Sequence, residues 1–174
     1  MSRIIAHLHV FAINPSNSSG WLRIGHRTFP CLLGKKGRTY FKREGDNKSP
    51  IGKWKLELLY FRPDKGLRPL SRLPIKPLRK SDGWCDAKGH KDYNHYVNLP
   101  FPADHESLWR NDAAYDLLVT TSHNQRPRVQ GAGSAIFLHA WRQGATCTEG
   151  CVALKAADLR KVLAACSKTA YLVI

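Results

Sequence analysis

The sequence predicts a single, mainly β domain with one main helix, and three observations support this class. Short segments of alternating or continuous apolar residues recur along the chain, separated by clusters of turn-forming residues. Only residues 154–166 place apolar side chains at helical spacing. A length of 174 residues, 43% of them hydrophobic, suits one hydrophobic core rather than two. We therefore expect residues 1–174 to form one domain of many strands and few helices.

The first part of the chain predicts a β-hairpin. Residues 4–13 and 21–33 alternate as half-buried strands do, and the Asn, Pro, Ser and Gly residues at 14–20 supply the turn between them. Residues 42–52 are polar and contain chain-breaking residues, which predicts a loop. The segment 54–60 that follows is strand-like.

The segment 62–91 is expected to be a long, basic, proline-rich loop. Its four prolines each remove a backbone donor and restrict the preceding residue, so neither a long helix nor a central strand fits. Such a loop is either a lid or binding element, or an excursion without a function, and both interpretations stay open. The prolines are Pro63, Pro69, Pro74 and Pro77, and the cations are Arg62, Lys65, Arg68, Arg72, Lys76, Arg79, Lys80, Lys88 and Lys91.

The rest of the chain predicts one helical turn, three strands and the main helix. In chain order these are the turn at 105–110, the strands at 115–122 and 134–139, the helix at 154–166 and a closing strand at 171–174. Asp158 near the start of the helix and Lys168 near its end suit the helix macrodipole.

Charge and composition restrict the partners of the protein. Lys and Arg number 28 against 13 Asp and Glu, and the formal net charge of +15 favours an anionic partner such as nucleic acid, anionic lipid or an anionic cell-wall polymer. No apolar run is long enough for a membrane-spanning helix, so we expect no membrane span. His7 and His9 interrupt the apolar run at the N-terminus, and no secretory signal is visible.

The chain has five cysteines, Cys31, Cys85, Cys147, Cys151 and Cys166. Because the number is odd, at least one thiol remains after any pairing and is available for chemistry. A zinc site made of Cys85, Cys147, Cys151 and a histidine is one alternative. The C-x-x-x-C spacing is atypical of zinc ligands, however, and no second close ligand pair exists. We expect no metal and no cofactor.

The region most indicative of chemistry runs from Ser134 to Leu154. A buried strand ends at His139, and Cys151 follows after a short polar connection. A cysteine and a histidine on adjoining elements provide the nucleophile and the base that acyl transfer needs. Gly150 has no Cβ, so its amide and that of Cys151 can point at the oxyanion of a tetrahedral intermediate. The alternative for both side chains is a purely structural role, as a small buried hydrophobe and a core histidine.

Several motifs in this sequence resemble the L,D-transpeptidase family with its YkuD-like domain. The residues I-F-L-H at 136–139 and T-E-G-C-V at 148–152, followed by a helix, are similar to that family's catalytic block. K-R-E-G-D-N-K-S-P-I-G-K-W at 42–54 is similar to its E-G-D-x-x-T/S-P-x-G motif, and residues 131–139 match its approach to the histidine. The resemblance covers most of the chain, from about Gly34 to Leu163. It implies a β-sandwich-like catalytic domain that acts on peptidoglycan stem peptides.

The resemblance also implies roles for individual residues. Cys151 is the expected nucleophile, which forms a thioester, His139 is the expected general base, and Gly150 is expected to contribute an oxyanion amide. A backbone carbonyl commonly orients the imidazole in this family. Thr148 matches the family's hydroxyl position and is expected to brace the loop.

Three features depart from the family pattern. Glu149 stands where many members have a second histidine, Ala153 stands where they have arginine or asparagine, and the gap between the histidine and the cysteine is short. Another cation is therefore expected to hold substrate carboxylates, and Arg142 is the nearest candidate; a solvated surface charge is the alternative. Trp141 either walls the pocket with its flat face or packs against the loop. The expected substrate-binding set is thus Thr148, Glu149, Arg142 and Trp141.

The resemblance implies a peptidoglycan L,D-transpeptidase that cleaves an L,D bond in a stem peptide and passes the acyl group to an amine. One variant joins the first stem residue of one chain to the third of another. Hydrolysis by the same fold, of the L,D-carboxypeptidase or amidase type, is the first alternative. The second is a basic nucleic-acid-binding module in which Trp84, Tyr93 and Tyr96 stack on bases, although no recognised nucleic-acid motif is present.

Two observations point to different compartments. A peptidoglycan substrate predicts the periplasm or the cell envelope of a bacterium, whereas the lack of a visible signal peptide predicts the cytoplasm. We expect a monomer that binds no nucleic acid.

Overall fold

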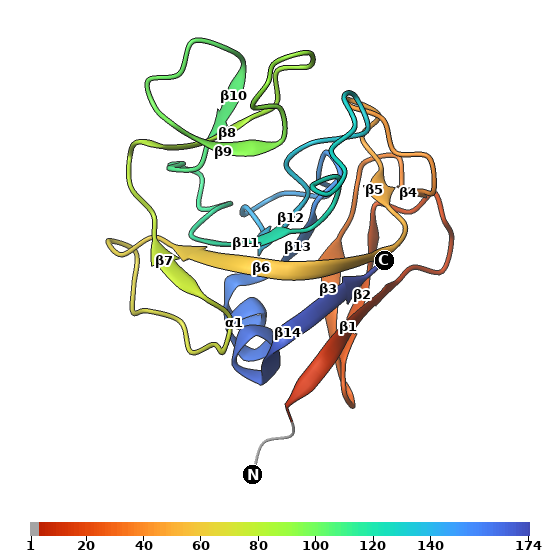
Figure 1. Ribbon diagram of the computed structural model, residues 1–174. Coiled ribbons are helices and arrows are strands. Elements are labelled where there is room, and N and C mark those ends of the chain that lie inside the picture. Colours follow the sequence, from red (N-terminus) through yellow and green to blue (C-terminus); the bar gives the residue numbers. More distant parts are fainter. Residues whose placement is uncertain (1–3) are drawn as a thin grey trace.

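Residues 4–174 are described by a computed structural model, and their secondary structure is mainly β (Figure 1). The strands are β1 (Ile5–Phe11), β2 (Ser19–Ile24), β3 (Arg27–Leu32), β4 (Arg38–Thr39), β5 (Ser49–Pro50), β6 (Lys53–Phe61), β7 (Ile75–Pro77), β8 (Asp82–Cys85), β9 (His95–Asn98), β10 (His105–Ser107), β11 (Leu117–Thr121), β12 (Phe137–Ala140), β13 (Val152–Leu154) and β14 (Cys166–Val173). Within these residues the single helix is α1 (Ala156–Ala165). The prediction of a mainly β domain with one main helix after the cysteine is confirmed.

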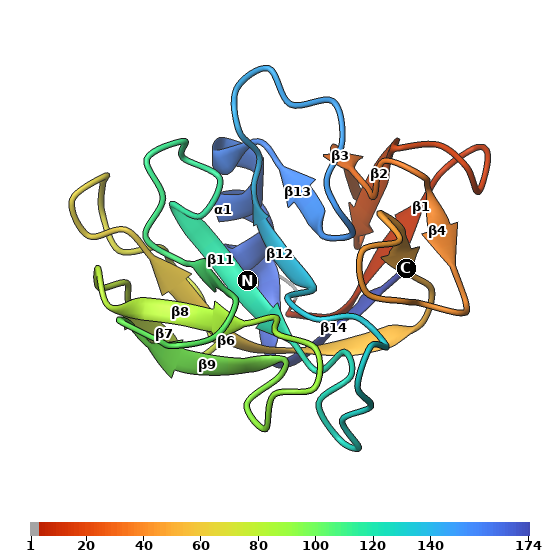
Figure 2. The same cartoon turned by 90° about the horizontal axis from the view of Figure 1, so that it is seen from above.

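The largest sheet closes on itself. Its strand order is β11-β12-β13-β3-β2-β1-β14-β6-β7, and β11 also pairs with β6. Eight strands therefore form a ring, and β7 extends it beside β6. Figure 2 shows β11, β12, β13, β3, β2 and β1 following one another around the molecule. The two layers expected of a sandwich are thus parts of one continuous sheet.

Two hydrophobic clusters cover the two sides of the strands that carry the catalytic block. Every residue of β11, β12 and β13 is buried, which explains their continuous apolar sequences. The larger cluster fills the ring and receives α1. The smaller one lies under β8 and contains Tyr115, Phe137 and Cys151. The side chains of α1 in the larger cluster are Leu159, Val162 and Leu163.

The helix is shorter than the predicted segment 154–166. Leu154 belongs to β13, and Cys166 already begins β14, which is consequently longer than the predicted strand 171–174. Asp158 lies in the first turn as expected. Lys168 does not lie near the helix end, because it belongs to β14, and the last turn carries no basic residue.

The opening hairpin is confirmed, since β1 and β2 are antiparallel with Phe11 opposite Trp21. Residues 21–33 are not one strand, however. They hold most of β2, a turn and β3, which pairs with β2 along its whole length. Gly25 makes this turn possible, because its φ of +60° is a conformation that favours glycine.

The prediction of a strandless loop at 62–91 is wrong in its second half. This segment contains β7 at the edge of the main sheet, and β8 at the centre of a second sheet of order β10-β8-β9. The prolines exclude a central strand only up to Pro77. Residues 78–91 contain no proline, and within them the fully buried β8 forms a central strand. In Figure 1 this second sheet lies above β11 and β12.

The helical turn predicted at 105–110 is also wrong. His105–Ser107 form β10, which pairs with β8 so that Glu106 lies opposite Trp84. Pairing with a distant strand has overridden the local preference of this short segment. Finally, no helix within residues 4–174 is long and apolar enough to cross a membrane.

Candidate active site

A cavity of about 410 Å³ opens beside the end of β12. It is lined by all the residues that the sequence singled out for catalysis or substrate binding, together with groups from the second sheet. The sequence-predicted residues on its wall are His139, Trp141, Arg142, Thr148, Glu149, Gly150 and Cys151. The fold therefore brings the whole predicted set together.

The pairing of β12 with β13 places the side chains of Cys151 and His139 on one face. The two strands are parallel, with His139 opposite Ala153. Cys151 lies two residues before Ala153, and side chains alternate along a strand, so the side chains of Cys151 and His139 point to the same side. Only 9% of Cys151 and 8% of His139 remain exposed. Both side chains reach the cavity.

The thiol of Cys151 is held by the backbone of the strand beside it. Its Sγ donates to the carbonyl of Ala135 at 3.1 Å and accepts from the N–H of Phe137 at 3.3 Å. Burial raises the pKa of this thiol to about 12, and the nearby charge of Glu106 acts in the same direction. Burial therefore favours the neutral form of the Cys151 thiol.

The imidazole of His139 is oriented by two backbone carbonyls. Its Nδ1 lies 3.0 Å from the oxygen of Ala114 and 2.7 Å from that of Ala140. Both oxygens are acceptors, so Nδ1 carries the proton and Nε2 carries the lone pair. Burial lowers the pKa of the imidazole, which keeps it neutral. No hydrogen bond of Nε2 occurs within residues 4–174, so Nε2 is available as a base.

The loop between β10 and β11 places the carbonyl of Ala114 against the imidazole. Arg110 and Asp112 form a two-fold ion pair with distances of 3.0 and 2.6 Å, and Asp112 also accepts from the N–H of Ala114 at 3.2 Å. The next residue, Tyr115, packs its ring nearly perpendicular to that of His139, with centroids 5.1 Å apart. The loop therefore holds the histidine both by hydrogen bonding and by packing.

Thr148 braces the turn that leads to the nucleophile, as expected. Its hydroxyl donates to the carbonyl of Cys151 at 2.7 Å and accepts from the N–H of Gly150 at 3.1 Å. The buried hydroxyl of Ser49 adds a second, longer contact of 3.4 Å to the same carbonyl. In this resting structure the amide of Gly150 is thus engaged by a hydroxyl within its own loop.

The remaining predicted residues form the outer part of the cavity. Arg142 and Glu149 are exposed on its rim, and Trp141 is half-buried on its wall. The ammonium of Lys155 lies 5.7 Å from the centre of the Trp141 ring, so this ring contacts a cation as well as the cavity. Neither Arg142 nor Glu149 has a side-chain hydrogen bond within the described residues.

Sequence reasoning missed several groups that shape the cavity. Ala114, Tyr115 and Glu106 come from segments far from the catalytic block in sequence, and Lys42 and Ser49 come from the motif at 42–54. That motif was a usable signal for Ser49, since its S-P-x-G part contains this residue. A backbone carbonyl such as that of Ala114 leaves no side-chain signal at all.

The structure also places the residues of the zinc and nucleic-acid alternatives. Residues 4–174 contain no group of three or more His, Cys, Asp or Glu side chains that could hold a metal ion. All five cysteines are free, and Cys85 lies apart, with its sulfur 4.0 Å from His90. Of the three aromatic rings proposed to stack on bases, Trp84 and Tyr93 are 7% and 0% exposed, whereas Tyr96 is half-buried.

The fold and the site define a β domain that presents a cysteine and a histidine to one cavity. The chain belongs to the L,D-transpeptidase catalytic domain family, YkuD, whose match covers residues 9–174. The resemblance seen in the sequence is therefore confirmed over essentially the whole chain. This family acts on peptidoglycan stem peptides. The chain has no significant match among curated proteins.

Proposed function

We propose that this protein is a cysteine-dependent peptidoglycan L,D-transpeptidase. The observation that carries the proposal is the shared cavity, in which the Sγ of Cys151 and the imidazole of His139 lie on the same face with Nε2 available. A neutral thiol and a neutral base in one cavity are a competent starting state, because the proton moves only when a substrate carbonyl is attacked.

In the first step, Cys151 attacks the carbonyl of an L,D peptide bond in a stem peptide. The Sγ–C bond forms while the thiol proton moves to Nε2 of His139. The tetrahedral intermediate then collapses, the C–N bond breaks, and His139 returns the proton to the departing nitrogen. The products are a thioester on Cys151, a free amine and a neutral histidine.

In the second step, an amine from another stem attacks the thioester. Its nitrogen forms a new C–N bond, and its surplus proton passes through Nε2 of His139 to the departing sulfur of Cys151. The result is a cross-link between two stems. With water in place of the amine, the same steps release a shortened stem, which is the alternative activity of an L,D-carboxypeptidase or amidase type.

The oxyanion of both intermediates needs hydrogen-bond donors. We propose that the amide of Gly150 supplies one of them by exchanging its partner, the hydroxyl of Thr148, for the oxyanion. The hydroxyl keeps its own bond to the carbonyl of Cys151 at 2.7 Å during this exchange, so the loop stays braced.

Residues on the outer wall are proposed to bind the substrate. Arg142 is an exposed guanidinium on the rim and suits a stem carboxylate, since its planar group binds carboxylates through two hydrogen bonds. Trp141 provides a flat apolar wall, and Thr148 and Glu149 complete the edge nearest the nucleophile.

Purified protein incubated with muropeptides tests the reaction. We expect cross-linked dimers by mass spectrometry, including a product that joins the first stem residue of one chain to the third of another. Shortened monomers without dimers support the hydrolytic alternative. The absence of any product with every stem tested contradicts the proposal.

We further propose that the protein works as a monomer in the periplasm or the cell envelope, because its substrate class lies outside the cytoplasmic membrane. Fractionation of cells that produce the full-length protein tests the location. Recovery of the protein in the cytoplasmic fraction alone, with no envelope pool, contradicts it.

A further inference from the structure

The backbone of Ala135, just before β12, has a conformation that alanine rarely adopts. Its φ is +49°, in the left-handed region, where a Cβ is unfavourable. In this conformation the carbonyl of Ala135 accepts from the Sγ of Cys151 at 3.1 Å, and the N–H of Phe137 donates to the same sulfur at 3.3 Å. The backbone that holds the thiol therefore depends on a conformation that needs support from other parts of the molecule.

That support comes from the side chain of Asn94, in the turn before β9. Its Oδ1 accepts from the N–H of Ala135 at 3.1 Å and from Nε1 of Trp84 at 2.9 Å. Its Nδ2 donates to the carbonyls of His123 and Asn124 at 3.1 and 3.0 Å. Asn94 is only 2% exposed, so these four hydrogen bonds are shielded from bulk water.

A primary amide of this length satisfies all four neighbours of Asn94. Two of them are N–H donors and two are carbonyl acceptors, so the side chain must offer one oxygen and one NH2 group. A carboxylate would set an oxygen against the two carbonyls, and an apolar side chain would leave all four groups buried without partners. The φ of Asn94 is itself +56°, a region in which asparagine is enriched among residues other than glycine.

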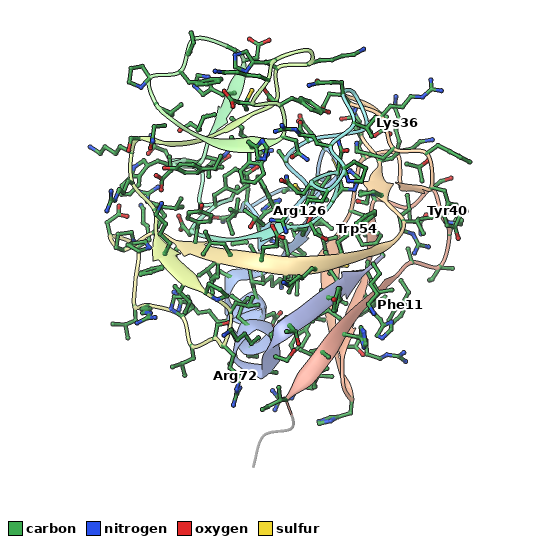
Figure 3. All side chains as sticks on the ribbon, viewed as in Figure 1. Phe11, Lys36, Tyr40, Trp54, Arg72 and Arg126 are labelled. Atoms are coloured by element: carbon green, nitrogen blue, oxygen red, sulfur yellow. The ribbon has the colours of Figure 1, made fainter. Side chains whose placement is uncertain are left out.

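The surrounding elements fix Asn94 in turn. Its own N–H donates to the carbonyl of Cys85 at the end of β8, and its carbonyl accepts from Nε2 of Gln125, both at 2.7 Å. The neighbouring His123 packs against β6, where the ring of Trp54, labelled in Figure 3, stands nearly perpendicular to the imidazole with centroids 4.7 Å apart. Asn94 thus connects both sheets to the backbone beside the thiol.

We propose that Asn94 is a positioning residue for the nucleophile, because its hydrogen bond holds Ala135 in the conformation that orients the thiol of Cys151. This inference rests on the proposed function, in which that thiol attacks a stem peptide. Asn94 does not line the cavity, so it acts through Ala135 rather than on the substrate. Without Oδ1, the N–H of Ala135 loses its partner, the backbone relaxes toward negative φ, and the carbonyl turns away from Sγ.

The rate of acyl-enzyme formation at saturating donor separates positioning from binding. Asn94→Gly keeps a residue that adopts positive φ and removes the side chain. We expect this rate to fall about tenfold, while the donor concentration that gives half the maximal rate stays within about twofold of the parent. The matched control is Gln125→Ala, which removes a hydrogen bond to the backbone of Asn94 and leaves its amide in place. Its rate should stay within about twofold of the parent.

Two further variants distinguish positioning from a general loss of stability. Glycine adopts a φ of +49° without the penalty of a Cβ, so adding Ala135→Gly to Asn94→Gly should raise the rate about threefold or more. A protein that is merely destabilised gains nothing from another glycine, because glycine increases the entropy of the unfolded chain. Asn94→Asp keeps an oxygen acceptor for Ala135 and loses the two donors. It should lower thermal stability but keep the rate within about threefold of the parent.

A rate in Asn94→Gly close to that of the parent overturns the inference, and so does a double variant that recovers no rate. A half-saturating donor concentration that rises as much as the rate falls indicates a structural role and also overturns it. If Asn94→Gly does not fold, Asn94→Asp decides. Retention of its rate supports the inference, and a loss of about tenfold with the acceptor still present overturns it.

A second readout keeps this inference separate from the proposed function. If the parent forms no acyl-enzyme, the proposed function fails, and labelling of Cys151 by a small alkylating reagent, followed by peptide mapping, then tests the positioning. Cys151 should be labelled faster in Asn94→Gly than in the parent or in Gln125→Ala, because its sulfur is no longer held by the backbone of Ala135. Equal labelling in all three proteins overturns the inference.

Discussion

The carbonyl oxygen of Ala114 lies 3.0 Å from Nδ1 of His139, across 25 residues of sequence. This contact, with that of Ala140, decides which nitrogen of the imidazole faces the cavity. The carbonyl belongs to a loop rather than a strand, so its position depends on the Arg110–Asp112 pair that shapes the loop. The orientation of the base is thus supported by an ion pair that does not touch it.

Replacing Asp112 with Asn should therefore slow catalysis while the protein remains folded. We expect the rate of acylation to fall about tenfold, because the pair with Arg110 weakens and the carbonyl of Ala114 loses its fixed position. The matched control is Asp158→Asn, since Asp158 pairs with Lys161 on α1, away from the cavity and from this loop. It should alter thermal stability more than rate, and equal rate losses in the two variants would falsify this role.

The rate of acylation should fall at low pH and should not change between neutral pH and about pH 10. Burial lowers the pKa of His139 below its ordinary value of 6.5, so the base stays neutral at pH 7 and activity is lost only as pH falls through that lowered pKa. The pKa of Cys151 is raised to about 12, so no thiolate accumulates near the ordinary value of 9.0. Single-turnover rates should be level from pH 7 to about 10. A rise in rate centred near pH 9 contradicts a neutral resting thiol.

Replacing Gly150 with Ala should abolish most activity and destabilise the protein. Its φ is +150°, and a Cβ there would lie 3.0 Å from the carbonyl oxygen of Lys48 and 3.1 Å from Ile136. Strain and overlap together should cost about 1–3 kcal/mol of the free energy of unfolding. Gly144→Ala is the control, because it has a φ of +75° in the same connection but open space around it. Chemical denaturation measures the free energy of unfolding of both variants. Because Gly144→Ala introduces backbone strain without overlap, a larger loss in Gly150→Ala reports the overlap of the added Cβ. Equal losses in the two variants contradict a contribution from overlap.

Thiol reagents should react first with a cysteine other than the nucleophile. Four of the five cysteines are buried, and Cys147 alone is half-buried. We expect a small alkylating reagent to label Cys147 fastest. Cys147→Ser should keep nearly full activity, because within residues 4–174 that sulfur makes no hydrogen bond to Cys151 or His139. In this variant, labelling should become slow and inactivation should follow the labelling of Cys151. Loss of activity in Cys147→Ser contradicts this assignment.

The sequence predicted the elements whose signals are local. Leu159 and Val162 recur at helical spacing, and the apolar run ending at His139 marks a buried strand. The Cys151–His139 pair was also accessible, because neighbouring parallel strands bring residues that are near in sequence to one edge of the sheet. Local patterns were sufficient for these features.

The features that were missed depend on distant pairing. Residues 105–107 form a strand only because β8 lies beside them, and that pairing is what brings Glu106 to the cavity. The carbonyl of Ala114 reaches His139 because β11 pairs with β12, with Leu118 opposite His139. Backbone groups and long-range pairs carry no pattern in a single sequence, so neither contact was foreseeable.

Intact-mass spectrometry of the protein with a stem peptide donor, in the absence of an acceptor amine, measures the thioester itself. We predict a mass increase equal to the donor acyl group, located by peptide mapping on Cys151 and absent from a folded Cys151→Ala variant. An adduct on another cysteine, or turnover by Cys151→Ala, would contradict the assignment of the nucleophile.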